Sequence, residues 1–275
     1  MKKSLILLAL PALLLSGCSK EISKEDAKKR AQEIVDHEVK LEDFKKVRVE
    51  TVEENKVEGE VGGFENTKQV MEYSTDDKWV HGYEVIEGKE GEQTIKREEE
   101  SWAYQEDGNY YTVERVNNNG EEMKAYNVYQ ESDEGWVAEK ILFDAAFSLI
   151  QTGAFGGLTG KEALKELIKT IDGGAFDGLN FDLKYFSSGE GNLTVEGKKV
   201  DTKYELFGYK GEVTSTVKAG WDKYVMAENS ETSEGTLKNA DNKEVKFTGS
   251  SKTTYSYEVS VTKPDLSGYQ QGGLN

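Results

Sequence analysis

The chain has almost no cysteine, proline or histidine. Its 275 residues include one cysteine, two prolines and two histidines. A single cysteine excludes a disulfide within the chain, so a folded domain must draw its stability from an apolar core. Pro264 is the sole proline after residue 18, and a chain so poor in proline has no rigid linker between domains. The two histidines, His37 and His81, lie far apart in the sequence, and we expect structural or solvated roles for both.

Basic residues are also scarce. The chain carries 35 Lys and Arg against 52 Asp and Glu, for a net charge of −17. Removal of an N-terminal segment with Lys2 and Lys3 would lower the charge by 2, to −19. Such a charge repels nucleic acid and anionic lipid head groups. We therefore exclude nucleic acid as a partner.

The sequence contains no catalytic signature. It has no Gly-x-Ser-x-Gly motif, no His-Glu-x-x-His motif and no phosphate-binding loop. The run Glu98-Glu99-Glu100 lies in a segment with strand periodicity, where alternate carboxylates point to opposite faces. We therefore expect no catalytic residue, no metal site, no cofactor and no enzymatic activity.

The first 18 residues carry the most specific signal. Lys2 and Lys3 precede an apolar run at 5–15, which is too short to span a bilayer and ends in Leu15-Ser16-Gly17-Cys18. This segment resembles the bacterial lipoprotein signal, whose motif, the lipobox, is a Leu, two small residues and a Cys. The alternative is a plain secretory signal with an incidental cysteine.

The resemblance implies cleavage between Gly17 and Cys18 and acylation of Cys18 with a diacylglycerol and a further chain such as palmitate. One acyl chain gives marginal anchoring, and several give a stable anchor. The implied location is extracytoplasmic, with the protein held to the bacterial cell membrane and cell envelope through Cys18. We expect a signal peptide at 1–17, a lipidated tether at 18–23 and a single domain at 24–275.

Periodicity predicts the elements of that domain. Apolar residues at helical spacing, with Ser23 and Asp26 in the manner of a capping box, predict a helix over 24–40. From residue 44 the period changes to two, and about six strands fit between 44 and 130. The dipeptides Asp107-Gly108 and Asn119-Gly120 indicate tight hairpins. Without room for crossover helices, these strands should be antiparallel.

The second half of the chain begins with helices. Residues 137–151 are apolar on nearly all sides, which is typical of a buried helix. A second helix is expected over 161–171, and strands resume from residue 181. The clearest alternation, at 255–261, predicts a last strand that Pro264 ends. The sequence therefore predicts an α+β fold, mainly antiparallel β, with a strongly curved sheet, an incomplete barrel, covered by a few helices.

This order of elements behind a lipoprotein signal resembles the lipoprotein-carrier superfamily and the related lipid-binding lipoproteins of mycobacteria. The likeness is of architecture and implies an apolar cavity that holds acyl chains. The apolar helical segment suggests Phe143, Phe147, Leu149 and Ile150 as ligand-binding residues. The alternative is that these four side chains are ordinary core.

We therefore expect a membrane-anchored, non-enzymatic, lipid-binding lipoprotein that acts as a monomer. A sheet incompletely covered by its helices leaves a natural apolar pocket. The alternative is a surface lipoprotein with a filled core that serves as a protein-interaction or structural envelope module.

Overall fold

The computed structural model describes residues 19–58, 63–90, 92–133, 137, 140–141, 143–145, 147–148, 157–171 and 182–272. The expected signal peptide, cleavage site and acylated residue, including Gly17 and Cys18, lie outside these residues. Every strand, and helices α1 and α3, lie between Lys20 and Gln271.

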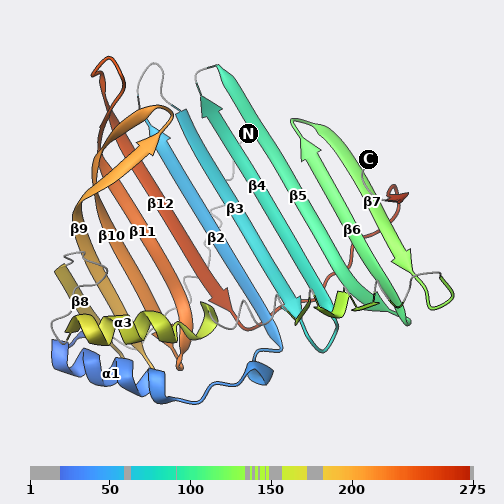
Figure 1. Cartoon of the computed structure of the whole chain (residues 1–275), viewed down its shortest axis with the longest axis horizontal. Helices are drawn as coiled ribbons and strands as arrows, with labels where there is room; N and C mark the ends of the chain where they lie inside the picture. Colours follow the sequence, from blue (N-terminus) through green and yellow to red (C-terminus); the bar gives the residue numbers. More distant parts are fainter. Residues whose placement is uncertain are drawn as a thin grey trace, which may run out of the picture.

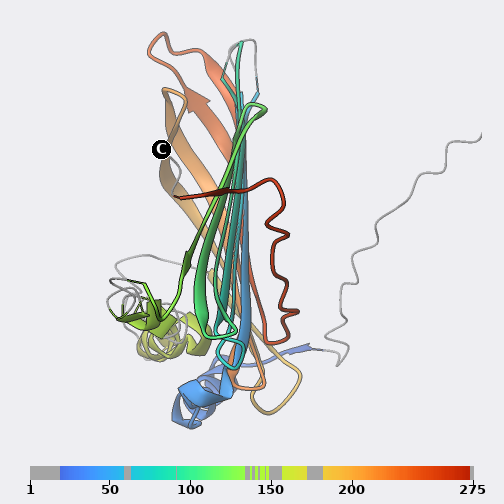
Figure 2. The same ribbon diagram turned by 90° about the vertical axis from the view of Figure 1, so that its right-hand side faces the viewer.

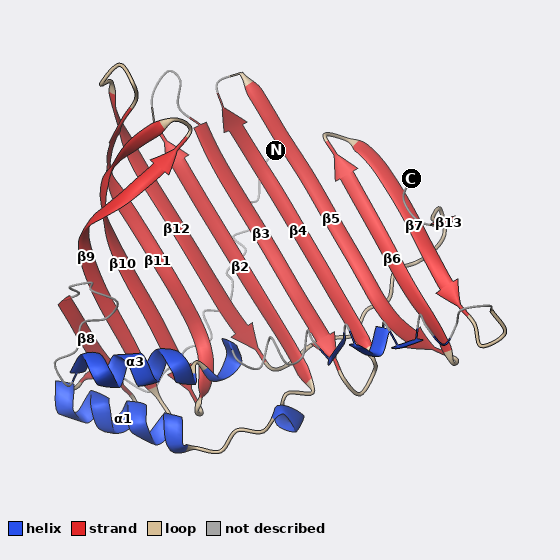
Figure 3. Cartoon of the chain, in the orientation of Figure 1, coloured by secondary structure: helices blue, strands red, loops and turns tan. Residues whose placement is uncertain are grey.

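The described residues form one open sheet of thirteen strands (Figures 1 and 3). Its order is β1-β8-β9-β10-β11-β12-β2-β3-β4-β5-β6-β7-β13. Neighbouring strands are antiparallel except the short β13, which runs parallel to β7. The strands are β1 (Lys20–Glu21), β2 (Lys46–Val57), β3 (Gly63–Ser74), β4 (Trp79–Glu90), β5 (Gln93–Glu106), β6 (Asn109–Asn118), β7 (Glu121–Tyr129), β8 (Asp182–Ser187), β9 (Leu193–Leu206), β10 (Tyr209–Asp222), β11 (Val225–Lys238), β12 (Glu244–Ser256) and β13 (Gln270–Gln271).

The six antiparallel strands expected between 44 and 130 are present as β2–β7. Both predicted hairpin turns are present as well. Asp107 and Gly108 have φ values of 49° and 83°, and Asn119 and Gly120 have values of 52° and 96°. Two successive positive φ values match the right-handed twist of the flanking strands, so Asp-Gly and Asn-Gly are well suited to these positions.

The predicted curvature is concentrated in the second half of the sheet. Edge-on, β2–β7 stand nearly flat, whereas β9–β12 curl to one side (Figure 2). Strand β10 also has register irregularities, between Gly220 and Trp221 in its pairing with β11 and between Val213 and Ser215 in its pairing with β9. A Cβ at Gly211 would lie 2.5 Å from the Thr236 carbonyl oxygen. Glycine therefore allows the backbones to crowd together on the concave face.

Helices α1 (Lys24–Asp36) and α3 (Lys161–Ile171) pack at the lower end of the curved half (Figure 3). The Ser23 side chain accepts a hydrogen bond from the Asp26 backbone N–H, which is the expected cap. Both helices contribute to one core cluster with the sheet. Its buried members are Ala27, Ala31, Ile34, Leu164, Leu167, Ile171, Tyr185, Leu193, Trp221 and Met226.

The expectation that the first helix continues to residue 40 is wrong, since α1 ends at Asp36. His37 is extended, with ψ at 128°, and its ring stacks on Tyr224 with centroids 3.7 Å apart. Lys161 donates a hydrogen bond to the His37 carbonyl oxygen. Val39 packs on a different core cluster, so an extended chain satisfies the apolar pattern that suggested a helix.

The last strand is also displaced, because β12 ends at Ser256 and not at residue 261. Val259 and Val261 instead pack against Trp79 and Trp102. The Trp79 indole N–H donates to the Thr262 carbonyl oxygen at 2.9 Å. The chain thus leaves the sheet and crosses its convex face (Figure 2), where an aromatic surface attracts the apolar residues.

The β10–β11 turn contains two non-glycine residues in the left-handed region, Lys223 (φ 48°) and Tyr224 (φ 69°). A non-glycine residue there costs roughly 1–2 kcal/mol, and asparagine tolerates the region better. Lys223→Asn should therefore stabilise the protein by about 1 kcal/mol and raise the midpoint of thermal unfolding by about 2–4 °C. Circular dichroism during heating measures this midpoint.

The matched control is Lys203→Asn, at an exposed position of strand β9. Asparagine is unfavourable in strands, so this variant should be neutral or less stable. Equal effects of the two substitutions would contradict the assignment of strain to Lys223.

Candidate functional site

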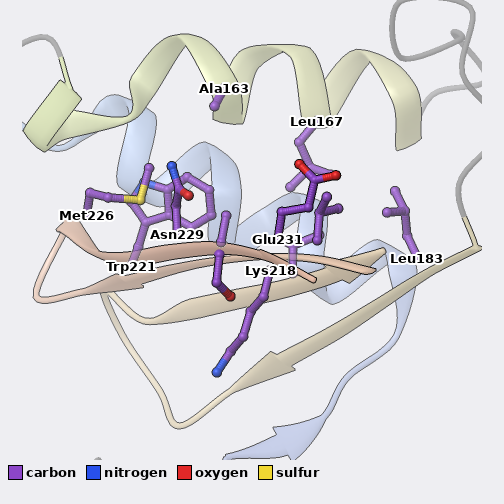
Figure 4. A pocket seen from close by; sticks show the side chains of 12 residues that line it. Ala163, Leu167, Leu183, Lys218, Trp221, Met226, Asn229 and Glu231 are labelled. Carbon is purple, nitrogen blue, oxygen red and sulfur yellow. The ribbon is translucent and has the colours of Figure 1, made fainter. Parts of the chain in front are cut away.

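An apolar cavity of about 330 Å³ lies between α3 and strands β8–β11 (Figure 4). This volume is within the range of small-molecule pockets, and dry apolar cavities of about 150 Å³ already bind benzene. The residues that line the cavity are Ala163, Leu167, Leu183, Val195, Val217, Lys218, Ala219, Trp221, Met226, Asn229, Ser230 and Glu231.

The roof of the cavity is the apolar face of α3. Leu164, Leu167 and Ile171 recur at helical spacing and are buried against the sheet. Ala163 lies at the cavity in place of a larger side chain (Figure 4). On the floor, Ala219 and Val217 alternate along β10 on the concave face. Because these side chains are small, they leave space between α3 and the sheet, and this space is the cavity.

Trp221 and Met226 form one wall, and the chain approaches them closely just before α3. The Trp221 indole N–H donates to the Thr159 carbonyl oxygen at 3.3 Å. Gly160 has a φ of 56°, and a Cβ there would lie 2.6 Å from Trp221 Nε1 and 2.7 Å from Met226 Cε. Glycine at position 160 therefore allows α3 to begin directly against this wall.

The mouth of the cavity is polar. Asn229 and Glu231 of β11 are exposed, and the Glu231 carboxylate points toward α3 (Figure 4). Lys218 extends away from the cavity in the same view, and its Nζ lies 2.6 Å from Glu228 Oε1. The charge at the mouth is therefore negative.

Two of the four predicted ligand-binding residues, Phe143 and Phe147, lie elsewhere. The Phe143 ring contacts Tyr110 of β6, with centroids 4.9 Å apart, and the Phe147 ring meets Tyr73 of β3 edge-on at 6.3 Å. Phe147 joins a core cluster and neither phenylalanine lines the cavity under α3. Leu149 and Ile150 are outside the described residues. The sequence signal that could have located the cavity is the alternation of Val217, Ala219 and Trp221, with small residues opposite α3.

The convex face carries a different cluster, centred on His81 of β4. Its Nδ1 lies 2.9 Å from Glu72 Oε2 and its Nε2 3.0 Å from Glu100 Oε1. Arg48 donates to Glu72 at 2.6 Å and Arg115 to Glu100 at 3.3 Å. With both ring nitrogens engaged, His81 offers no free lone pair to a metal ion or a substrate. We therefore interpret the cluster as structural.

Electrostatics supports a charged imidazolium at this position. Burial by itself would lower the pKa of His81, but hydrogen bonds to Glu100 and Glu72 outweigh it and raise the pKa to about 9. Burial would raise the pKa of Glu72, whereas His81 and Arg48 hold it below its usual value.

Within the described residues, no three histidine, cysteine or acidic side chains are placed to hold a metal ion. Nor is any helix in that part of the chain both long and apolar enough to cross a membrane.

Stability should depend on pH through His81. A pKa raised from 6.5 to about 9 on folding stabilises the protein fully below pH 6.5, and the stabilisation is lost as the pH rises through 9. At pH 6 we expect the free energy of unfolding of the wild type to exceed that of His81→Gln by about 1–2 kcal/mol. Partial hydration of the ring keeps this difference modest. Denaturant unfolding at pH 6–10 measures this difference, and His37→Gln is the control. A difference that does not shrink above pH 9 would contradict the charged state.

Comparisons with known proteins leave the function open. No protein-family model matches the chain, and neither does any curated protein. Among solved structures, the chain is similar to a β-barrel-like protein of a domain of unknown function (DUF1849) from Brucella abortus. That match has a TM-score of 0.22 and 9% sequence identity, and covers 76% of this chain and 98% of the other. It assigns no ligand and no activity, so the cavity under α3 must be interpreted from its own geometry.

Proposed function

We propose that this chain is a bacterial lipoprotein whose curved sheet binds an apolar, lipid-like ligand outside the cytoplasmic membrane. The observation that carries the proposal is the apolar cavity of about 330 Å³ under α3. The lipobox at Leu15-Ser16-Gly17-Cys18 supports the anchor. The sequence-level resemblance to the lipoprotein-carrier superfamily supports a ligand with acyl character.

The position of the first strand relates the proposed anchor to the cavity. Lys20 pairs with Ser187 of β8, and β8 also supplies Leu183 to the cavity wall. Two residues of extended chain span at most about 7 Å, so an anchor at Cys18 would tether the β1–β8 edge of the sheet closely. This edge of the sheet would then be held near the membrane surface, from which lipid-like ligands are available.

The size of the cavity limits the affinity that apolar contact can provide. A sphere with the volume of the cavity has a surface of roughly 230 Å², and burying that much apolar ligand surface contributes about 6 kcal/mol at 25 cal/mol per Å². The loss of ligand freedom on binding must be subtracted from this value. Apolar burial alone therefore gives weak binding, and a tight ligand needs an additional polar contact.

Binding can be tested on the chain from Ser19 onward, after cooperative unfolding has been verified. We expect native mass spectrometry to find a co-purified small molecule, and calorimetry to detect binding of decanol to the emptied protein. Ala219→Phe should fill the cavity and reduce decanol affinity at least about tenfold, because the ligand loses its apolar site. Ala240→Phe, at an exposed turn, is the matched control. A bare mass together with no uptake of decanol would refute the proposal.

The anchor has its own test in the full chain. Cys18→Ala should abolish incorporation of labelled palmitate and leave the precursor uncleaved. Ser16→Ala keeps a small residue in the motif and should be labelled normally. Palmitate labelling that persists in Cys18→Ala would show that Cys18 is not the acylated residue.

A protein-interaction module is the second candidate. Val137 and Ile141 stand four residues apart on a helical segment and are 63% and 61% exposed, which is unusual for large apolar side chains. A protein partner that is lost in Ile141→Ser, combined with no small-molecule binding, would favour this alternative.

A further inference from the structure

The apolar cavity under α3 adjoins a second, polar cavity on the same concave face. This second cavity has a volume of about 140 Å³, and it is lined in part by Glu53, Asn55, Tyr204, Glu231, Ser233 and Ser251. Glu231 lines both cavities. A ligand in the apolar cavity would therefore meet the Glu231 carboxylate at the point where it enters the polar one.

The sheet register aligns a second carboxylate with Glu231. Glu231 of β11 pairs with Ser251 of β12, and Ser251 pairs with Glu53 of β2. Directly paired residues share a face, so the two carboxylates flank Ser251 on the concave side. Their Cα atoms are two strand spacings apart, roughly 10 Å. Two flexible side chains at this separation can both reach a small group placed over Ser251.

These two carboxylates lack the ion pairs that neutralise the opposite face of the same strands. On the convex face, Glu50 of β2 lies 2.9 Å from Lys68, and Glu228 of β11 lies 2.6 Å from Lys218. Among the described side chains, Glu53 and Glu231 have no basic group within 4.0 Å. Both carboxylates accept hydrogen bonds from hydroxyl groups, Glu53 from Ser251 at 3.4 Å and Glu231 from Ser233 at 3.2 Å.

The other described residues that line the polar cavity are neutral. The Tyr204 hydroxyl donates to Asn55 Oδ1 at 2.9 Å. Burial, together with the carboxylates of Glu231 and Glu53, raises the pKa of Tyr204. An anionic head group in the polar cavity would meet repulsion, whereas a cation would be attracted.

We propose that the ligand is a cationic amphiphile, with its apolar part in the cavity under α3 and an ammonium group between Glu231 and Glu53. This inference rests on the proposed function and names the ligand class. It supplies the polar contact that the small apolar cavity requires. It also excludes simple fatty acids, whose carboxylate would be repelled from the mouth.

Three probes of equal chain length and different charge test the inference by calorimetry: decylamine, decanol and decanoate at pH 7, below their micelle concentrations. We expect decylamine to bind at least about tenfold more tightly than decanoate, with a smaller ratio at high salt because the sites are partly exposed. Glu231→Gln and Glu53→Gln should each weaken decylamine about three- to fivefold and leave decanol unchanged. Glu234→Gln, on the convex side of β11, is the matched control and should leave the affinities for decylamine and decanol unchanged.

The outcomes separate this inference from the proposed function. If the three probes bind equally, or if Glu231→Gln behaves like Glu234→Gln, the apolar site stands and the cationic head group is refuted. If none of the probes binds, the proposed function itself fails. A fourth probe, lysophosphatidylethanolamine, identifies the source of the amine. If it binds as tightly as decylamine does, the ligand is a membrane lipid. If it binds much more weakly, the ligand is an amine without phosphate.

Discussion

The pairing of β12 with β2 is the interaction on which the rest of the structure depends. It joins two antiparallel meanders, β2–β7 and β8–β12, along a ladder from Phe247–Val57 to Ser256–Arg48. The paired residues are about 200 positions apart, so forming this ladder closes a very long loop. Without it, each meander would expose an edge strand, and the concave face would end at β12. Glu53 and Glu231 also share one surface because of this ladder.

The two faces of the sheet are stabilised in different ways. The convex face of β2–β7 carries rows of ion pairs around His81, and the C-terminal segment covers its aromatic residues Trp79 and Trp102. The concave face is apolar near the helices and again near Phe247 and Leu237, with a polar region between. Charge is thus neutralised on one face and left unpaired at the cavity mouth on the other. That asymmetry supports the proposal of a binding site on the concave face.

Helix α3 determines where the concave face is hollow. Its larger apolar residues reach the core, and Gly160 lets it start directly against Trp221. Ala163 and Ala219 both line a gap that none of the described side chains fills. Protein interiors are normally packed densely, so a gap of this size beside a polar mouth supports the proposed ligand site.

The sequence by itself determined what local chemistry controls. Alternation from residue 44 specified six strands, Asp107-Gly108 and Asn119-Gly120 specified their turns, and the spacing of Leu164, Leu167 and Ile171 specified α3 over 161–171. Tertiary structure decided the rest. Helix α1 ends where His37 stacks on the distant Tyr224 ring. Val259 has the alternation of a strand residue but packs on an aromatic surface formed by β4 and β5. The cavity arises where residues from α3, β8 and β10 fail to fill space together, and no single segment encodes it, because packing depends on partners that are distant in the sequence.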